Sequence, residues 1–222
     1  VVVATDSQGL GGGGRHQDAV AGTQARDAID SIRAAGGMGL SGSGKKALVY
    51  GWSQGGGATI AAASMPGYIG KTGTAFDGID MVGFVALAPQ DVSVMLNGAD
   101  ATEASSKKAL DGMTAMFSDN VFNFTHFAMT MWAMPQAFPD LSLADIFTPE
   151  GIQAFDQVFS RKCMHAAADT LSFNFGSSYK TFLKPESTNA QDWIRALAQG
   201  SVPPVKPVAP VAIYWGVKET AV

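Results

Sequence analysis

Residues 51–55 (GWSQG) have the types and spacing that nucleophilic chemistry requires. They match the pattern G-x-S-x-G between an apolar, strand-like run and a helix of small residues, the context in which this pattern forms a sharp turn. Such a turn strains the serine backbone and lifts the Ser53 hydroxyl above the carboxyl edge of a sheet. Gly51 and Gly55 are expected to make room, because side chains at those positions would collide.

The chemistry predicted from this turn is acyl transfer. Ser53 would attack a carbonyl carbon. The Gln54 backbone N–H would bind the developing oxyanion at the amino end of the following helix, where the helix dipole is positive. The alternative is a glycine-rich strand–helix turn that contains an ordinary serine.

A phosphate-binding interpretation of the glycine-rich loop 9–14 is weaker. Gly9, Gly11 and Gly14 fit G-x-G-x-x-G, but a run of glycines fits that pattern easily. No acidic residue ends a second strand about 20 residues later, as a dinucleotide site would require. The sequence therefore favours the serine interpretation.

The composition excludes several classes of protein. The 222 residues are 46% hydrophobic and 15% charged, with a net charge of −4, so neither disorder nor a nucleic-acid partner is expected. No apolar run is long enough to span a membrane. The single cysteine, Cys163, excludes an internal disulfide framework and a multi-cysteine metal site. The predicted chemistry requires no metal or cofactor.

Strands and helices alternate along the chain, which predicts a parallel sheet. The glycine pair at 36–37 is a helix stop signal. The expected strands are Val1–Thr5, Ala47–Tyr50, Val82–Ala88 and Val208–Trp215, and the expected helices between the first three are Asp18–Ala35 and Ala58–Met65.

Three zones differ in composition. Residues 1–91 hold most of the 26 glycines, and residues 92–200 hold most of the 13 phenylalanines and 10 methionines. We expect 1–91 to be an α/β core, 92–200 a helical cap, and 201–222 the return to the core sheet. The Met- and Phe-rich stretch Met113–Phe138 could line an acyl-chain pocket; the alternative is that it packs the cap onto the core.

Five segments together resemble the secretory lipase (lipase A-like) family of α/β hydrolases. They are 3–11 (VATDSQGLG), 27–35 (DAIDSIRAA), 51–56 (GWSQGG), 143–168 and 215–222. The resemblance implies an α/β-hydrolase core, a mostly parallel sheet with flanking helices, carrying a large helical cap insertion.

The resemblance also implies roles for single residues. Ser53 matches the nucleophile, and the Gln54 N–H and Asp6 match the oxyanion positions. Glu219 falls where the family usually has its triad aspartate, so the acid here has a longer side chain. Trp52 also departs from the family pattern, where a smaller or phenolic side chain is usual.

The acid and the base each have more than one candidate. Asp91, after the strand Val82–Ala88, is the alternative acid to Glu219. The catalytic histidine of such enzymes follows the acid in chain order, which would place it beyond Val222. The three histidines of the chain have ordinary interpretations as loop, packing and cap residues: His16, His126 and His165.

The expected function is a serine carboxylester hydrolase that acts on lipid or other apolar acyl esters. Alternatives are an acyltransferase or peptidase with the same site, or a non-catalytic lipid-binding fragment. The apolar ends lead us to expect a piece of a longer protein. The resemblance implies secretion or a cell-envelope location for that protein, although these 222 residues contain no signal-peptide pattern. The cap could contact a lipid interface.

Overall fold

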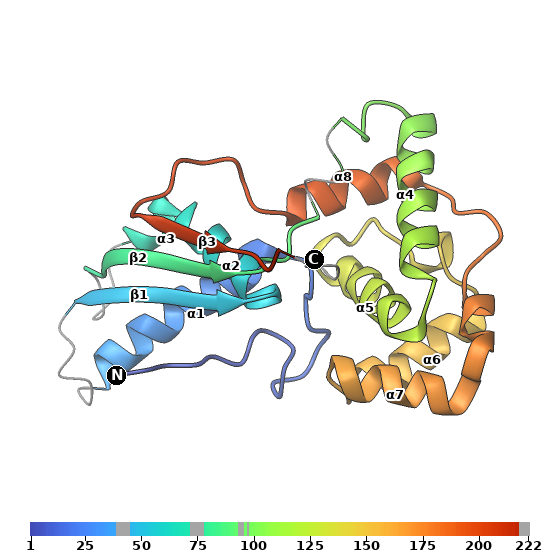
Figure 1. The fold of residues 1–222 in the computed structure, drawn as a ribbon, viewed down its shortest axis with the longest axis horizontal. Helices are drawn as coiled ribbons and strands as arrows, with labels where there is room; N and C mark the ends of the chain where they lie inside the picture. The colour runs from blue at the N-terminus through green and yellow to red at the C-terminus, as the bar shows by residue number, and fades with distance from the viewer. Residues whose placement is uncertain (39–44, 72–77, 93–95, 97, 218–222) are drawn as a thin grey trace. The chain divides into compact units, whose positions relative to one another are not determined.

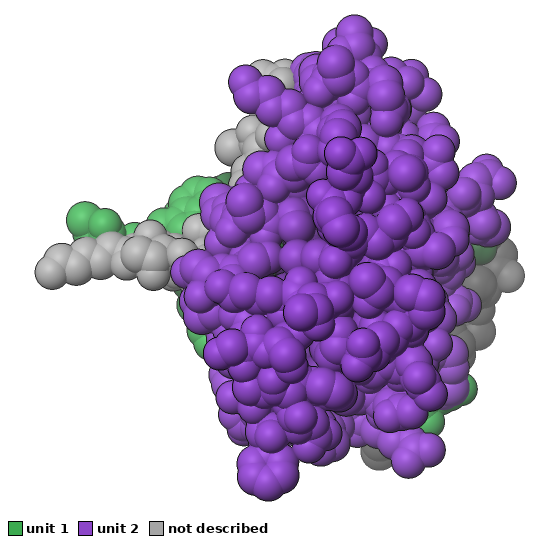
Figure 2. Space-filling model, turned by 90° about the vertical axis from the view of Figure 1, so that its right-hand side faces the viewer, with its two compact units in different colours: residues 1–12, 20–91, 199–222 green, residues 13–19, 92–198 purple. Residues whose placement is uncertain are grey.

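A computed structural model describes residues 1–38, 45–71, 78–92, 96 and 98–217, which form two compact units. Unit 1 comprises residues 1–12, 20–91 and 199–222, and unit 2 comprises residues 13–19 and 92–198. Figure 2 colours the two units separately. Residues 13–19, which lie inside the first composition zone, thus belong to the second unit.

Unit 1 is built on a parallel sheet, as the alternating pattern predicted. In the described residues its strands are β1 (Lys46–Trp52), β2 (Asp80–Leu87) and β3 (Val211–Tyr214), in the order β1-β2-β3 (Figure 1). Two helices stand between β1 and β2 in the described residues, whereas the whole of 92–198 stands between β2 and β3. The sheet therefore aligns the carboxyl ends of strands that are distant in sequence.

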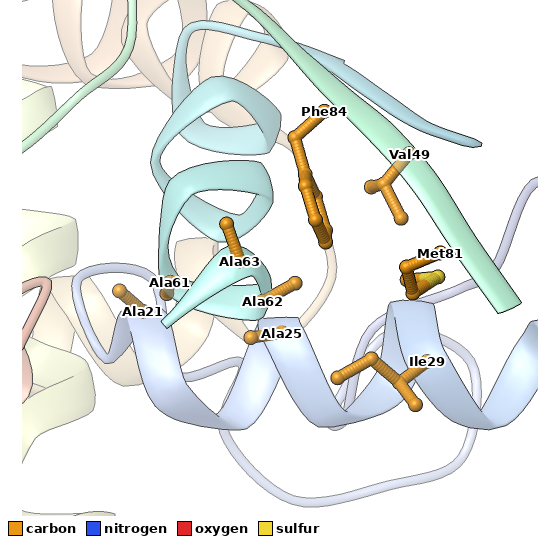
Figure 3. Packing of buried hydrophobic residues seen from close by; sticks show 9 residues of the cluster. All are labelled: Ala21, Ala25, Ile29, Val49, Ala61, Ala62, Ala63, Met81 and Phe84. Carbon is orange, nitrogen blue, oxygen red and sulfur yellow. The ribbon is translucent and has the colours of Figure 1, made fainter. Parts of the chain in front are cut away.

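Helices cover one face of this sheet. α1 (Ala21–Gly37) ends at the predicted glycine stop, and α2 (Gln54–Ala63) is followed by the short α3 (Pro66–Ile69). Small side chains on both long helices let them approach each other and the sheet closely. The core between them, seen in Figure 3, consists of Ala21, Ala25, Ile29, Val49, Ala61, Ala62, Ala63, Met81 and Phe84.

The opposite face of the sheet is exposed in the described structure. Side chains alternate along β1, so Val49 points into the core while Leu48, Tyr50 and Trp52 point away from it, and Trp52 is 70% exposed. Val82 on β2 is also exposed. The continuous apolar run of Val82–Ala88 is typical of a strand buried on both faces, but in the described structure the core covers β2 on one side only.

The predicted first strand does not form. Val1–Thr5 is irregular, and Val2 is 96% exposed. A β-branched run becomes a strand only where a neighbouring strand satisfies its backbone groups. The ladders of the described residues join β1 to β2 and β2 to β3 and do not include this segment.

Unit 2 is helical. Several of its helices begin at polar caps whose side chains accept backbone N–H groups, among them Thr102, Asn120 and Thr148. Where residues are described, no helix is long and apolar enough to cross a membrane. The elements are α4 (Glu103–Phe117), α5 (Val121–Ala137), the 3₁₀ helix η2 (Leu143–Asp145), α6 (Pro149–Phe159), α7 (Met164–Phe175), the 3₁₀ helix η3 (Gly176–Phe182) and α8 (Ala190–Gly200), which runs into unit 1.

Aromatic rings form the core of unit 2. The ring of Phe155 on α6 lies 4.9 Å from Phe147, 5.1 Å from Phe159 and 6.1 Å from Phe124. α5 is buried almost continuously from Phe124 to Met134. This burial favours packing, rather than an acyl-chain pocket, as the role of the Met- and Phe-rich stretch.

Residues 13–19 are fixed to unit 2 by a charged and aromatic cluster. The Arg15 guanidinium donates to Asp156 Oδ1 (2.9 Å) and to the carbonyl of Trp132 (3.1 Å), and it stacks 4.8 Å from the Trp132 ring. Trp132 Nε1 donates to the same Asp156 oxygen (2.7 Å), and Thr130 donates to Asp18 (2.8 Å). The chain therefore passes from unit 1 to unit 2 within the glycine-rich loop.

The environment of His126 makes the stability of unit 2 depend on pH. Its ring lies 5.3 Å from Phe122, which also contacts His165. Burial lowers the pKa of His126; the nearby Asp18 opposes that change, and His165 adds to it. Because the folded pKa lies below the unfolded value of about 6.5, unfolding takes up protons. This contribution to stability is present above about pH 6.5 and is lost as the pH falls.

We expect His126→Gln to reduce the fall in melting temperature between about pH 6.5 and pH 5, because glutamine does not titrate there. Near-UV circular dichroism of the protein at a series of pH values measures it. His165→Gln, at an exposed position, is the control and should keep most of the slope. Identical slopes for His126→Gln and the unmodified protein would contradict the assignment.

Candidate active site

The chain reverses direction at Ser53. β1 ends at Trp52 and α2 begins at Gln54, so Ser53 alone makes the connection. Its backbone angles are φ 52° and ψ −117°, in a region that costs a non-glycine residue about 1–3 kcal/mol. The structure thus contains the sharp, strained turn that G-x-S-x-G predicted, with Ser53 partly exposed and the amino end of α2 directly after it.

Gly51 is required by this turn. A Cβ atom at Gly51 would lie 1.9 Å from the carbonyl oxygen of Gly55 and 2.6 Å from Thr59 Oγ1. That carbonyl is held in place, since Thr59 donates a hydrogen bond to it (2.8 Å) and is itself 1% exposed. The expected steric role of Gly51 is confirmed.

The expected steric role of Gly55 is wrong. A Cβ atom there would meet no atom within 4 Å. The reason is geometric: the backbone carbonyl of Gly55, and not its side-chain position, faces Gly51. The crowded glycines on this helix are instead Gly56 and Gly57, which sequence reasoning missed. The sequence did contain a signal for this crowding, because residues 55–57 are all glycine whereas G-x-S-x-G requires only the first of them.

Backbone hydrogen bonds hold Ser53 from two sides. Its N–H donates to the carbonyl of Leu87 at the end of β2 (2.9 Å). Its carbonyl accepts from the N–H groups of Gln90 (2.9 Å) and Gly57 (3.1 Å). No hydrogen bond among the described residues involves the Ser53 hydroxyl, so that group is available to a substrate or a base.

Asp6 and Gln54 line different hollows of unit 1. Asp6 is exposed and shares a hollow of about 550 Å³ with Asp27 and Asp30 of α1. Gln54 and Gly55 line another, of about 930 Å³. The two hollows share part of their lining, including the residue before Asp6, and the assignment of Asp6 and Gln54 to the oxyanion stays a prediction.

Of the two candidate acids, the structure describes Asp91 but not Glu219. Asp91 is partly buried and follows Gln90 at the carboxyl end of β2. Glu219 lies outside the described residues. All three histidines of the chain belong to unit 2, so unit 1 supplies hydroxyl and carboxylate groups but no imidazole. Among the described residues no group of side chains could hold a metal ion.

Comparison with known proteins establishes the fold. Neither a protein-family profile nor a curated protein matches the sequence. Among solved structures, the rice cell wall degrading esterase LipA from Xanthomonas oryzae matches with a TM-score of 0.67 at 14% identity, over 92% of this chain and 52% of that one. A protein from Legionella pneumophila, provisionally assigned as a hydrolase, matches with a TM-score of 0.68 at 15% identity, over 96% and 54%.

These matches identify the fold as that of the α/β hydrolases, which confirms the predicted fold class. Its parallel sheet and flanking helices are those of the core seen in unit 1. The chain spans about half the length of the structures it matches. Membership of the secretory lipase family remains a prediction from the sequence.

The steric difference between the two motif glycines can be measured. We expect Gly51→Ala to lower the free energy of unfolding by about 1–3 kcal/mol or more, because the new methyl group meets fixed backbone atoms. Gly55→Ala should change it by less than about 1 kcal/mol, since its methyl group meets open space and alanine favours the helix. Urea denaturation compares them, and equal losses would refute the geometry described for the turn.

Proposed function

We propose that this chain carries the nucleophile of a serine hydrolase that cleaves carboxylic esters through an acyl-enzyme on Ser53. The observation that supports it is the positive φ of Ser53 in a one-residue turn between β1 and α2. A fold retains such strain where the surrounding contacts determine it, and such positions cluster at functional sites. The α/β-hydrolase fold adds support, although fold by itself does not define function.

In the proposed reaction, the Ser53 hydroxyl attacks the ester carbonyl while a histidine takes its proton. The Gln54 N–H stabilises the tetrahedral oxyanion, and the family resemblance suggests Asp6 as the second contributor, through its backbone N–H. Collapse of this intermediate expels the alcohol, which takes the proton from the histidine. Water then attacks the acyl-enzyme, releases the carboxylic acid and restores the hydroxyl.

The partners of Ser53 in this proposal follow from the resemblance. Glu219 would orient the histidine, with Asp91 as the alternative. The histidine itself would follow the acid in the longer protein, because enzymes of this kind carry nucleophile, acid and histidine in that chain order. We propose apolar acyl or lipid esters as substrates, in a secreted or cell-envelope protein.

Substitution of the nucleophile tests the proposal directly. In the full natural protein, Ser53→Ala should lower ester hydrolysis by about 10⁴-fold or more, because no other hydroxyl replaces the attacking group. It should also abolish covalent labelling by a fluorophosphonate probe, located by peptide mass spectrometry. Ser31→Ala, at a partly buried serine whose hydroxyl donates to Ala28, is the matched control.

Each outcome has a defined meaning. Hydrolysis at nearly the unmodified rate in Ser53→Ala would refute the proposal. An unmodified protein with neither hydrolysis nor labelling would favour a non-catalytic, lipid-binding role. Labelling of Ser53 with transfer of the acyl group to an acceptor other than water would identify an acyltransferase.

The two candidate acids are separated by a second pair of variants. We expect Glu219→Gln to reduce kcat by about 10³–10⁴-fold, because an amide cannot stabilise the imidazolium that forms during attack. Asp91→Asn should change kcat by only a few-fold. Steady-state kinetics on a soluble ester measure both, and the reverse order of effects would assign the acid to Asp91.

A further inference from the structure

The turn that follows β2 contacts the nucleophile turn at several points outside the G-x-S-x-G motif. Leu87 accepts the Ser53 N–H and Gln90 donates to the Ser53 carbonyl, both at 2.9 Å. Both polar backbone groups of Ser53 are thus bonded to a segment more than thirty residues further along the chain. The strained conformation of Ser53 is therefore held by tertiary contacts as well as by its own sequence neighbours.

Two glycines of α2 leave the space that this turn needs to lie against the helix. A Cβ atom at Gly56 would lie 2.8 Å from Pro89 Cα and 3.0 Å from the Leu87 carbonyl oxygen. A Cβ atom at Gly57 would lie only 2.2 Å from the carbonyl oxygen of Gln90. These neighbours are backbone atoms, which cannot move aside as a flexible side chain would. An alanine at either position would have to push the turn away from the helix.

The turn itself is strained and anchored. Ala88 has φ 39°, a positive value that is unfavourable for alanine, and it is 7% exposed. Its N–H donates to the carbonyl of Tyr214 on β3 (2.7 Å). The segment is therefore fixed to β3 on one side and to Ser53 on the other, and it cannot shift without breaking a hydrogen bond.

We propose that the turn 88–90 positions the nucleophile. Gly57 leaves space for this turn, and the turn sets the backbone angles of Ser53 and therefore the direction of its hydroxyl. This inference rests on the proposed function of Ser53. In this proposal Gly57 and Gln90 act through the backbone of Ser53, so they are positioning residues. Displacement of Gln90 should misdirect the hydroxyl and slow its attack while leaving the binding of a ligand nearly unchanged.

The test separates the attack from binding by measuring inactivation of the full natural protein at a series of fluorophosphonate concentrations. Gly57→Ala should lower the maximal inactivation rate by about 100-fold, the usual effect of a misplacement near 1 Å. The concentration for half-maximal rate should stay within about 3-fold, because the change is in orientation and not in the binding surface. Gly22→Ala in α1, whose new methyl group would meet only the flexible end of Met65 at 3.6 Å, should behave like the unmodified protein.

A second pair of variants covers the case in which Gly57→Ala does not fold. Gln90→Pro removes the N–H that donates to the Ser53 carbonyl, whereas Gln90→Ala keeps it. The proline variant should show the same loss of maximal rate, and the alanine variant should not. Near-UV circular dichroism identifies the folded variants, and only those are compared.

The outcomes distinguish this inference from the function on which it rests. No labelling of Ser53 in the unmodified protein would overturn the proposed function and, with it, the positioning role. Labelling of the unmodified protein, together with unchanged maximal rates in folded Gly57→Ala or Gln90→Pro, would overturn the positioning role alone. Loss of binding in proportion to rate would also overturn it, because that result indicates general disorder of the site.

Discussion

Unit 1 depends on one steric constraint, which is that the chain must turn from β1 into α2 at a single residue. Ser53 can adopt its positive φ only because Gly51 leaves space for the carbonyl of Gly55. Thr59 fixes that carbonyl from within the first turns of the helix. A larger residue at 51 would force the helix away from the strand, and the alanine-rich packing of α2 against the sheet would be lost with it.

The parallel sheet connects this turn to segments that are distant in the sequence. Parallel strands bring their carboxyl ends to one edge, so the turn after β2 and the end of β3 lie where Ser53 emerges. Gln90 can then donate a hydrogen bond to Ser53, and Ala88 to Tyr214, although the two residues of each pair are far apart in the sequence. Two strained non-glycine residues, Ser53 and Ala88, are held in place by the same sheet edge.

Unit 2 is organised by a different interaction, the packing of aromatic rings around Phe155. Many of the phenylalanines and methionines that suggested an adaptable pocket in the sequence are buried in this unit. Arg15, between Asp156 and the Trp132 ring, fixes residues 13–19 to the helices. Composition indicated an apolar surface here, but it could not say whether that surface would face a ligand or other side chains.

The sequence by itself determined the features that depend on neighbours a few residues away: the turn at Ser53, the end of α1 at its glycine pair, and the alternation of strands and helices from β1 to β2. Tertiary structure decided the rest, because distant backbone atoms were involved. It left Val1–Thr5 outside the strand ladders of the described residues, and it placed the close backbone contacts of α2 at Gly56 and Gly57 instead of Gly55. A motif specifies its own bend, whereas close approach between segments is specified only by the packed fold.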